Sequence, residues 1–156
     1  MGIGIEPAYV YAAKIQRVID GDSLCLTFDL GFDIFLGGQD GLNCRLYGVD
    51  TAEKRGYKDN PELKQLGILA TEFVKNEVDM KGSDVVVRTQ LDGERGKFGR
   101  ILVELFFPNE EESLNHLLLK ERLGVGYYGQ GKGDIFDAHM ANCAYHQDRG
   151  TLHGKD

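Results

Sequence analysis

The sequence predicts a mainly β protein of the α+β class, a five-stranded OB-type β-barrel with three α-helices. In the first half, three short runs rich in β-branched and aromatic residues are separated by glycine-rich turns. A helical pattern follows the third run, and two further strand-like runs then precede two more helical stretches. Five short strands with a helix after the third are typical of this barrel. With 156 residues, we expect one domain over residues 1–156, with its core at about 9–152.

The five expected strands all alternate or cluster apolar residues between turn residues. They cover Tyr9–Val18, Ser23–Phe28, Asn43–Val49, Asp84–Leu91 and Arg100–Phe107. Between the second and third, residues 29–43 alternate Phe32, Ile34 and Leu36 before two glycines. This pattern predicts a lengthened hairpin that protrudes as a flap.

The first helix is expected to begin at Asn60 and Pro61, an N-cap followed by a first-turn proline. Its apolar residues recur every three or four positions over about four turns: Leu63, Leu66, Ala70, Phe73, Val74 and Val78.

A second helix carries leucines from Leu114 to Leu123, with Gly124 as its stop. The third is expected from Asp134 to about Asp148, and its apolar spacing predicts a buried face of Phe136, Met140 and Ala144. The histidines have no metal-ligand spacing, so we expect them on helix surfaces or in the tail: His116, His139, His146 and His153.

The bulk composition limits the classes of function. A net charge of −7 argues against a protein that coats nucleic acid through its overall field, because phosphate affinity normally comes from clustered Lys and Arg. The three cysteines have neither CxxC spacing nor paired histidines, which argues against a zinc site or a disulfide framework. No run of apolar residues is long enough for a membrane span, and no export signal is evident at the N-terminus.

Carboxylates stand where the first two strands meet. In Asp20-Gly21-Asp22, Asp22 shares parity with Leu24 and Leu26, so its side chain is expected to face the barrel mouth. A buried carboxylate is costly unless it is paired or binds a metal. Asp-Gly is also a common turn dipeptide, and the triplet alone is compatible with a plain turn.

The segment from Arg45 to Glu53 begins with an arginine and ends with Asp50, Thr51 and Glu53. Oxygen ligands at a strand end, with free backbone carbonyls beside them, suit a hard cation such as calcium. The same carboxylates could instead cap the next element, and Arg45 could be a surface residue.

The polar turn at residues 92–99 leads into the last strand at Arg100. Its glycines around Lys97 let the backbone approach a ligand, and Arg100 can point into the same mouth. A solvated basic hairpin turn explains the segment equally well when it is taken alone.

Together these segments resemble the staphylococcal nuclease (thermonuclease) family. The runs VIDGDSL, RLYGVDTAE and GERGKFGR occur in the family's order, and the resemblance spans roughly Ile15 to Leu152. It implies a calcium-dependent (Ca2+) nuclease, a phosphodiester hydrolase that cleaves DNA and RNA and leaves 3′-phosphate ends.

The resemblance also implies roles for individual residues. Metal ligands fall on Asp22, Asp50 and the backbone carbonyl of Thr51, with Asp20 as a carboxylate behind them. The phosphate-binding arginines are Arg45 and Arg100, and Glu53 is the general base. Contacts to the nucleotide are expected from four further side chains: Lys97, Tyr127, Tyr128 and Lys132.

The chain departs from the family pattern in three respects. Ala52 stands where the family often has proline, the hairpin before Arg45 is longer, and the overall charge is acidic. Two alternatives therefore stay open: a catalytically silent OB-type module that binds nucleic acid or protein, and a structural domain whose aspartates only form turns. We expect a monomer without a membrane or protein partner, intracellular or phage-encoded, or secreted if the chain is a trimmed mature form.

Overall fold

The computed structural model describes residues 4–55, 59–89 and 99–152. In this part of the chain, five strands form a closed barrel with neighbour order β1-β6-β7-β4-β2, and β1 also pairs with β2. These strands are β1 (Val10–Asp20), β2 (Ser23–Asp29), β4 (Leu42–Leu46), β6 (Asp84–Arg88) and β7 (Ile101–Phe106). The β4–β7 pairing is parallel and the others are antiparallel. The predicted OB-type barrel with three helices is confirmed.

The expected third strand is divided into two. β4 ends at Leu46, Gly48 takes a positive φ of 76°, and β5 (Val49–Asp50) then leaves the barrel to pair with β8 (Val125–Gly126). The glycine permits this bend because it has no Cβ to clash in the left-handed region. The bend carries Asp50 toward the third helix.

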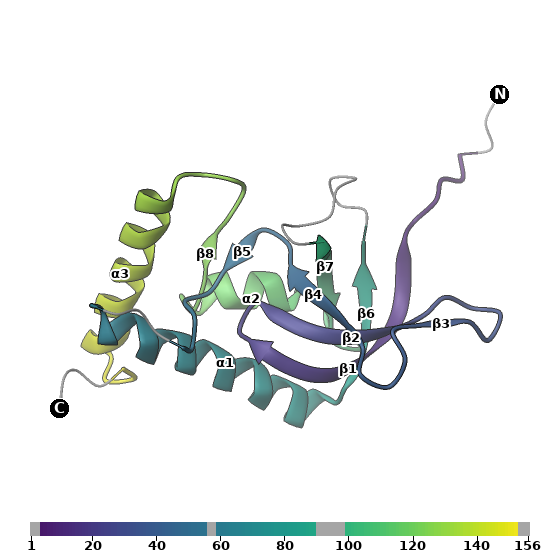
Figure 1. The fold of residues 1–156 in the computed structure, drawn as a ribbon, viewed down its shortest axis with the longest axis horizontal. Helices are drawn as coiled ribbons and strands as arrows, with labels where there is room; N and C mark the ends of the chain where they lie inside the picture. The colour runs from purple at the N-terminus through teal and green to yellow at the C-terminus, as the bar shows by residue number, and fades with distance from the viewer. Residues whose placement is uncertain (1–3, 56–58, 90–98, 153–156) are drawn as a thin grey trace.

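The long hairpin contains β3 (Phe35–Leu36), which pairs with the end of β2 and projects from the barrel (Figure 1). Phe32 at its tip is 96% exposed, and Ile34, Phe35 and Leu36 are exposed as well. The flap lies at the end of β2 opposite to Asp22.

Three helices accompany the barrel: α1 (Pro61–Lys81), α2 (Leu114–Lys120) and α3 (Lys132–Asp148). α1 begins at the predicted proline, although the Asn60 side chain makes no capping hydrogen bond, and it is longer than the predicted four turns. Its predicted contacts with the core are confirmed for Leu63, Leu66, Ala70 and Val74.

Two details of the later helices were predicted wrongly. α2 ends at Lys120, and the left-handed residue after it is Arg122 (φ 57°), so Gly124 is not the stop. In α3, Phe136 and Ala144 are exposed and Met140 is only partly buried. The buried face consists instead of His139, Asn142, Cys143 and His146.

One core packs the barrel strands against all three helices, and it runs from Ala13 to Leu152 in the sequence. At Gly67, α1 lies against the backbone that follows β5. A Cβ placed there would lie 2.5 Å from the carbonyl carbon of Glu53 and 2.6 Å from the carbonyl oxygen of Ala52. Helix α1 can therefore rest on the backbone that follows β5 only because position 67 has no side chain.

We expect Gly67→Ala to destabilise the protein by about 1–3 kcal/mol, although alanine is ordinarily preferred to glycine inside a helix by roughly 1 kcal/mol. The added methyl group would collide with rigid backbone. Urea denaturation would measure the free energy of unfolding. Gly133→Ala in α3 is the matched control, because nothing lies within 4 Å of a Cβ there, and it should be neutral or slightly stabilising. Equal stability of Gly67→Ala and the wild type would contradict the close packing.

Candidate active site

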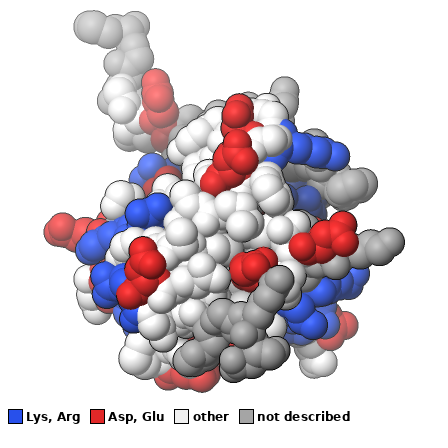
Figure 2. Space-filling model, turned by 90° about the vertical axis from the view of Figure 1, so that its left-hand side faces the viewer, with Lys and Arg blue, Asp and Glu red and all other residues white. Residues whose placement is uncertain are grey.

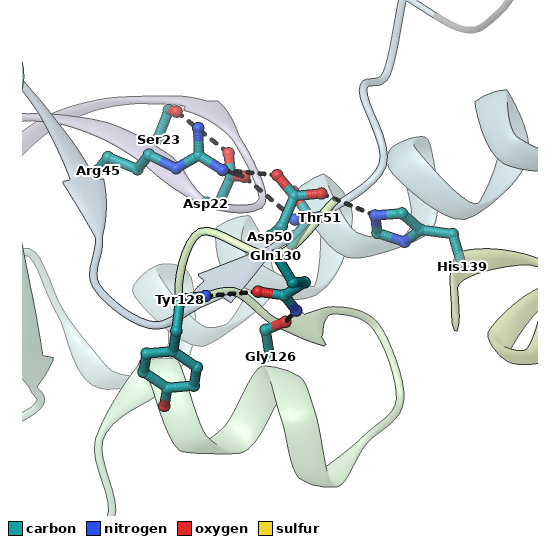
Figure 3. A network of polar contacts seen from close by, with 9 residues as sticks. All are labelled: Asp22, Ser23, Arg45, Asp50, Thr51, Gly126, Tyr128, Gln130 and His139. Carbon is teal, nitrogen blue, oxygen red and sulfur yellow. Dashed lines mark hydrogen bonds and ion pairs between the residues drawn. The ribbon is translucent and has the colours of Figure 1, made fainter. Parts of the chain in front are cut away.

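The candidate site lies where the β1–β2 turn, the end of β4, β5 and α3 meet (Figure 3). The turn packs closely at Gly21, where a Cβ would lie 2.9 Å from the Cβ of Ala70 and 3.0 Å from Cγ2 of Thr51. The absence of a side chain at Gly21 thus lets the turn pack against α1 and against the residue that follows β5. This packing brings Asp22 to the end of β5.

Asp22 is buried, with 7% of its surface exposed. Its Oδ2 accepts a hydrogen bond from the backbone N–H of Thr51 at 3.1 Å, and its Oδ1 accepts one from Ser23 Oγ at 3.1 Å. Removal from water raises the pKa of Asp22, and the Asp50 carboxylate raises it further, against the lowering effects of Arg45 and of both hydrogen bonds.

Arg45 lies between the two aspartates. Arg45 on β4 pairs with Ser23 on β2, so its guanidinium lies beside the β1–β2 turn. Nη2 lies 2.5 Å from Asp50 Oδ1 and 3.5 Å from Asp22 Oδ2. The arginine therefore supplies the positive charge that offsets both carboxylates.

His139 completes the group from the opposite side, and the prediction that it lies on a helix surface was wrong. Its side chain is 3% exposed, and Nε2 lies 2.8 Å from Asp50 Oδ2. Because its partner is 89 positions away in the sequence, the spacing of nearby residues could not predict this contact. His146 is also buried, where it bonds the Arg122 carbonyl and Thr151.

Two oxygen atoms near Asp22 are buried without a hydrogen-bond partner in the described part of the chain. They are Asp20 Oδ1 and Thr51 Oγ1. Buried polar atoms nearly always have partners, and an ion or a water molecule often provides one. Each of these two oxygens could thus accept one more hydrogen bond or contact a cation.

Residues 4–55, 59–89 and 99–152 contain no cluster of three or more His, Cys, Asp or Glu side chains suited to a metal ion. The predicted ligands include only two carboxylates, Asp22 and Asp50, and a backbone carbonyl. Their chemistry fits a hard cation that binds oxygen. The position between the carboxylates is taken by Arg45, so a metal ion would have to displace the guanidinium from Asp50.

The remaining predicted residues lie at varying distances from this group. Glu53 is exposed just after β5, and Arg100 is half-buried immediately before β7, whose Ile101 pairs with Cys44 beside Arg45. Lys97 lies outside the described residues. Lys132 is exposed at the start of α3.

The two tyrosines after α2 are not equivalent. Tyr127 is half-buried, and its ring centroid lies 5.3 Å from the Arg45 guanidinium carbon. Tyr128 is 73% exposed and contacts the Tyr47 ring edge-on. Its backbone N–H donates to Gln130, whose amide donates to the Gly126 carbonyl, so Gln130 fixes this loop (Figure 3).

A model of the family described as Staphylococcal nuclease homologue matches residues 43–144, which is more than half of the chain. The chain belongs to this family. The match covers Arg45, Asp50 and Arg100, while Asp22 lies before it. A search of curated proteins finds none that matches.

Membership in the staphylococcal nuclease family supports a nuclease or a nucleic-acid-binding module of the OB type. The described helices include none that is long and apolar enough to cross a membrane. On the face that carries α3, the basic and acidic side chains of the described residues are interspersed, and these residues do not form one basic field (Figure 2). Attraction of a polyanion to this face must therefore come from local groups.

We expect Asp22→Asn to stabilise the protein in the presence of chelator, increasingly so as the pH rises. Folding raises the pKa of Asp22. Below the ordinary pKa range of aspartate, the group is protonated in both the folded and the unfolded state, so its burial lowers stability by no ionisation cost. As the pH rises from that range through the folded-state pKa, the buried group ionises and the free energy of unfolding falls. The amide oxygen can still accept from Thr51. Melting curves at several pH values between about 4 and 8 would measure the difference in Tm, where each kcal/mol is worth roughly 2–4 °C.

Asp79→Asn on the exposed end of α1 is the control, and it should show no such growing difference. A buried-charge cost at Asp22 is contradicted if its substitution lowers Tm at every pH.

Proposed function

We propose that this protein is a calcium-dependent nuclease that hydrolyses phosphodiester bonds in DNA and RNA and leaves 3′-phosphate ends. The observation that carries the proposal is the pair of carboxylates on buried Asp22 and half-buried Asp50, with the Arg45 guanidinium between them. Burial of the Asp22 charge costs folding energy, and the pair occurs on the fold of a nuclease family.

Calcium would be held by the carboxylates of Asp22 and Asp50 and by the Thr51 carbonyl, where it would neutralise a phosphate oxygen and orient the group. Asp20 would support this set from behind, and its Oδ1 is buried without a hydrogen-bond partner among the described residues. Thr51 is tied to Asp22 by its own N–H, so two of the ligands are positioned relative to each other before any ion binds.

Arg45 has two exclusive uses in this scheme. Its Nη2 bonds Asp50, and with calcium held by the carboxylates its donors would be available to the phosphodiester. Arg100 supplies a second planar fork, and each charge-assisted hydrogen bond contributes about 1.5–3 kcal/mol. Negative charge accumulates on the phosphate oxygens as phosphorus becomes five-coordinate, so both arginines act most strongly in the transition state.

Glu53 orients the attacking water and accepts its proton. The side chain is exposed, and the backbone of this segment packs against α1 at Gly67. Acid–base assistance of this kind contributes about 10²–10⁴ in rate. Tyr127, stacked near Arg45, and Tyr128 offer aromatic faces to the bases, where stacking contributes about 1–3 kcal/mol per base.

The proposal is tested by incubating the purified chain with supercoiled plasmid and with RNA, in calcium or in chelator. We expect cleavage of both only with calcium, and DNA products that prime synthesis only after phosphatase treatment. Asp50→Asn should abolish cleavage, and Asp79→Asn should not. Retention of nucleic acid without cleavage, independent of calcium, would identify a binding module in place of a nuclease.

The two arginines should matter at least as much as the general base. We expect Arg45→Ala and Arg100→Ala to lower the single-turnover rate at saturating calcium by about 10²–10³ or more, because each removes transition-state charge stabilisation. Glu53→Gln should lose no more than either. Arg45→Lys should recover little, since lysine lacks the planar fork.

Arg88→Ala, on the exposed face of β6, is the control for loss of a positive charge. Single-turnover rates of the two arginine variants close to that of the wild type would refute the ranking.

A further inference from the structure

His139 is a buried polar side chain that none of the expected roles includes. It extends from α3 to the candidate site, where Nε2 lies 2.8 Å from Asp50 Oδ2 (Figure 3). Only 3% of its surface is exposed. A polar ring that is removed from water needs a hydrogen-bond partner to offset the lost hydration.

The donor and acceptor capacities of the two groups determine the direction of this hydrogen bond. A carboxylate can only accept, so the proton of the His139 ring is on Nε2. The other ring nitrogen, Nδ1, is buried and has no partner in the described part of the chain. A ring with its proton on Nδ1 would leave that donor unsatisfied and would set two acceptors against each other at 2.8 Å.

The contact divides the two oxygens of Asp50 between two partners. Oδ2 receives the His139 proton, and Oδ1 faces Arg45 and, beyond it, Asp22. Without His139 the carboxylate could rotate about its χ2 angle, which is broad and roughly two-fold. Because the two oxygens of a carboxylate are equivalent, the histidine fixes the plane of the group, so that one oxygen stays directed at the position between the aspartates.

We propose that His139 is a positioning residue for the cation site: by donating from Nε2 to Asp50 Oδ2, it holds Oδ1 toward Asp22 as a ligand. This inference rests on the proposed calcium site. Outer hydrogen-bond partners of ligating carboxylates orient them, and their loss typically weakens metal binding by about 10–100-fold.

The same face of α3 provides a matched control. Asn142 donates to the Gly124 carbonyl and accepts from Arg122, and His146 bonds the Arg122 carbonyl. These two residues anchor α3 to the segment between α2 and β8. His146 is thus a buried histidine of the same helix that contacts backbone and a threonine, and not a predicted ligand.

Isothermal titration of the full chain with calcium chloride tests the inference. We expect His139→Leu to raise the calcium Kd by about 10–100-fold, and His139→Gln, which keeps an N–H donor, to stay within about threefold of the wild type. His146→Leu should lower Tm in chelator and leave the calcium Kd unchanged. Equal Kd values for His139→Leu and the wild type, or equal losses in the leucine and glutamine variants, would overturn the positioning role.

If the wild type does not bind calcium, the proposed metal site fails, and the role of His139 fails with it. Should His139→Leu not fold, the wild type still provides a test. Long-range ¹H–¹⁵N correlation spectra report which ring nitrogen carries the proton. We expect the Nε2–H form of His139 in chelator, and a ring protonated on Nδ1 alone would overturn the inference.

Discussion

The burial of the Asp22 carboxylate beside a second, half-buried carboxylate, Asp50, is the constraint on which the site depends. The Asp50 carboxylate lies close enough to disfavour ionisation of Asp22, and water is largely excluded from Asp22. Uncompensated, such a pair would oppose folding. The compensation is local and comes from three different elements: Arg45 on β4, the Thr51 N–H after β5 and His139 on α3.

That compensation requires elements to approach more closely than side chains usually allow. Gly21 lets the first turn rest on α1 and Thr51, and Gly67 lets α1 rest on the backbone after Ala52. Gly124 does the same behind β5, where a Cβ would lie 2.5 Å from Val49. The backbone that carries Asp50 and Thr51 is thus enclosed on several sides. A site held by packed backbone can keep its charges together without a large cost in side-chain ordering.

Features of this site that depend on local sequence patterns could be predicted, and features that depend on contacts between distant residues could not. The order of strands and the parity of Asp22 with Leu24 and Leu26 are local patterns, and they correctly predict a barrel with Asp22 buried at its mouth. Likewise, the proximity of Arg45 to the first turn follows from antiparallel pairing of neighbouring strands. The predicted burial of Asp22, which needed only the period of a strand, was therefore confirmed.

The face of α3 could not be obtained in this way. Its apolar spacing favours Phe136, Met140 and Ala144, yet the buried side is largely polar because its groups bond backbone carbonyls near residues 122–124 and a carboxylate on β5. A buried histidine is favourable only where its partner exists, and that partner is 89 residues distant. Similarly, Gly124 resembles a helix stop in the sequence, but its small size is required by Val49. Tertiary partners, and not periodicity, determine these positions.

Under the proposed function, the acidic charge of the chain becomes part of how substrate is selected. Among the described residues, the α3 face has no continuous basic field, so this face offers a polyanion little attraction, and Arg45 is engaged by Asp50 and Asp22. If Asp22 and Asp50 held a divalent cation, the site would carry more positive charge, and the Arg45 fork would be available to phosphate. Phosphodiester binding to that fork would disfavour return of Arg45 to the aspartates, which by linkage would favour cation binding. Metal and nucleic acid are thus expected to bind cooperatively, because one arginine cannot serve both the carboxylates and the substrate.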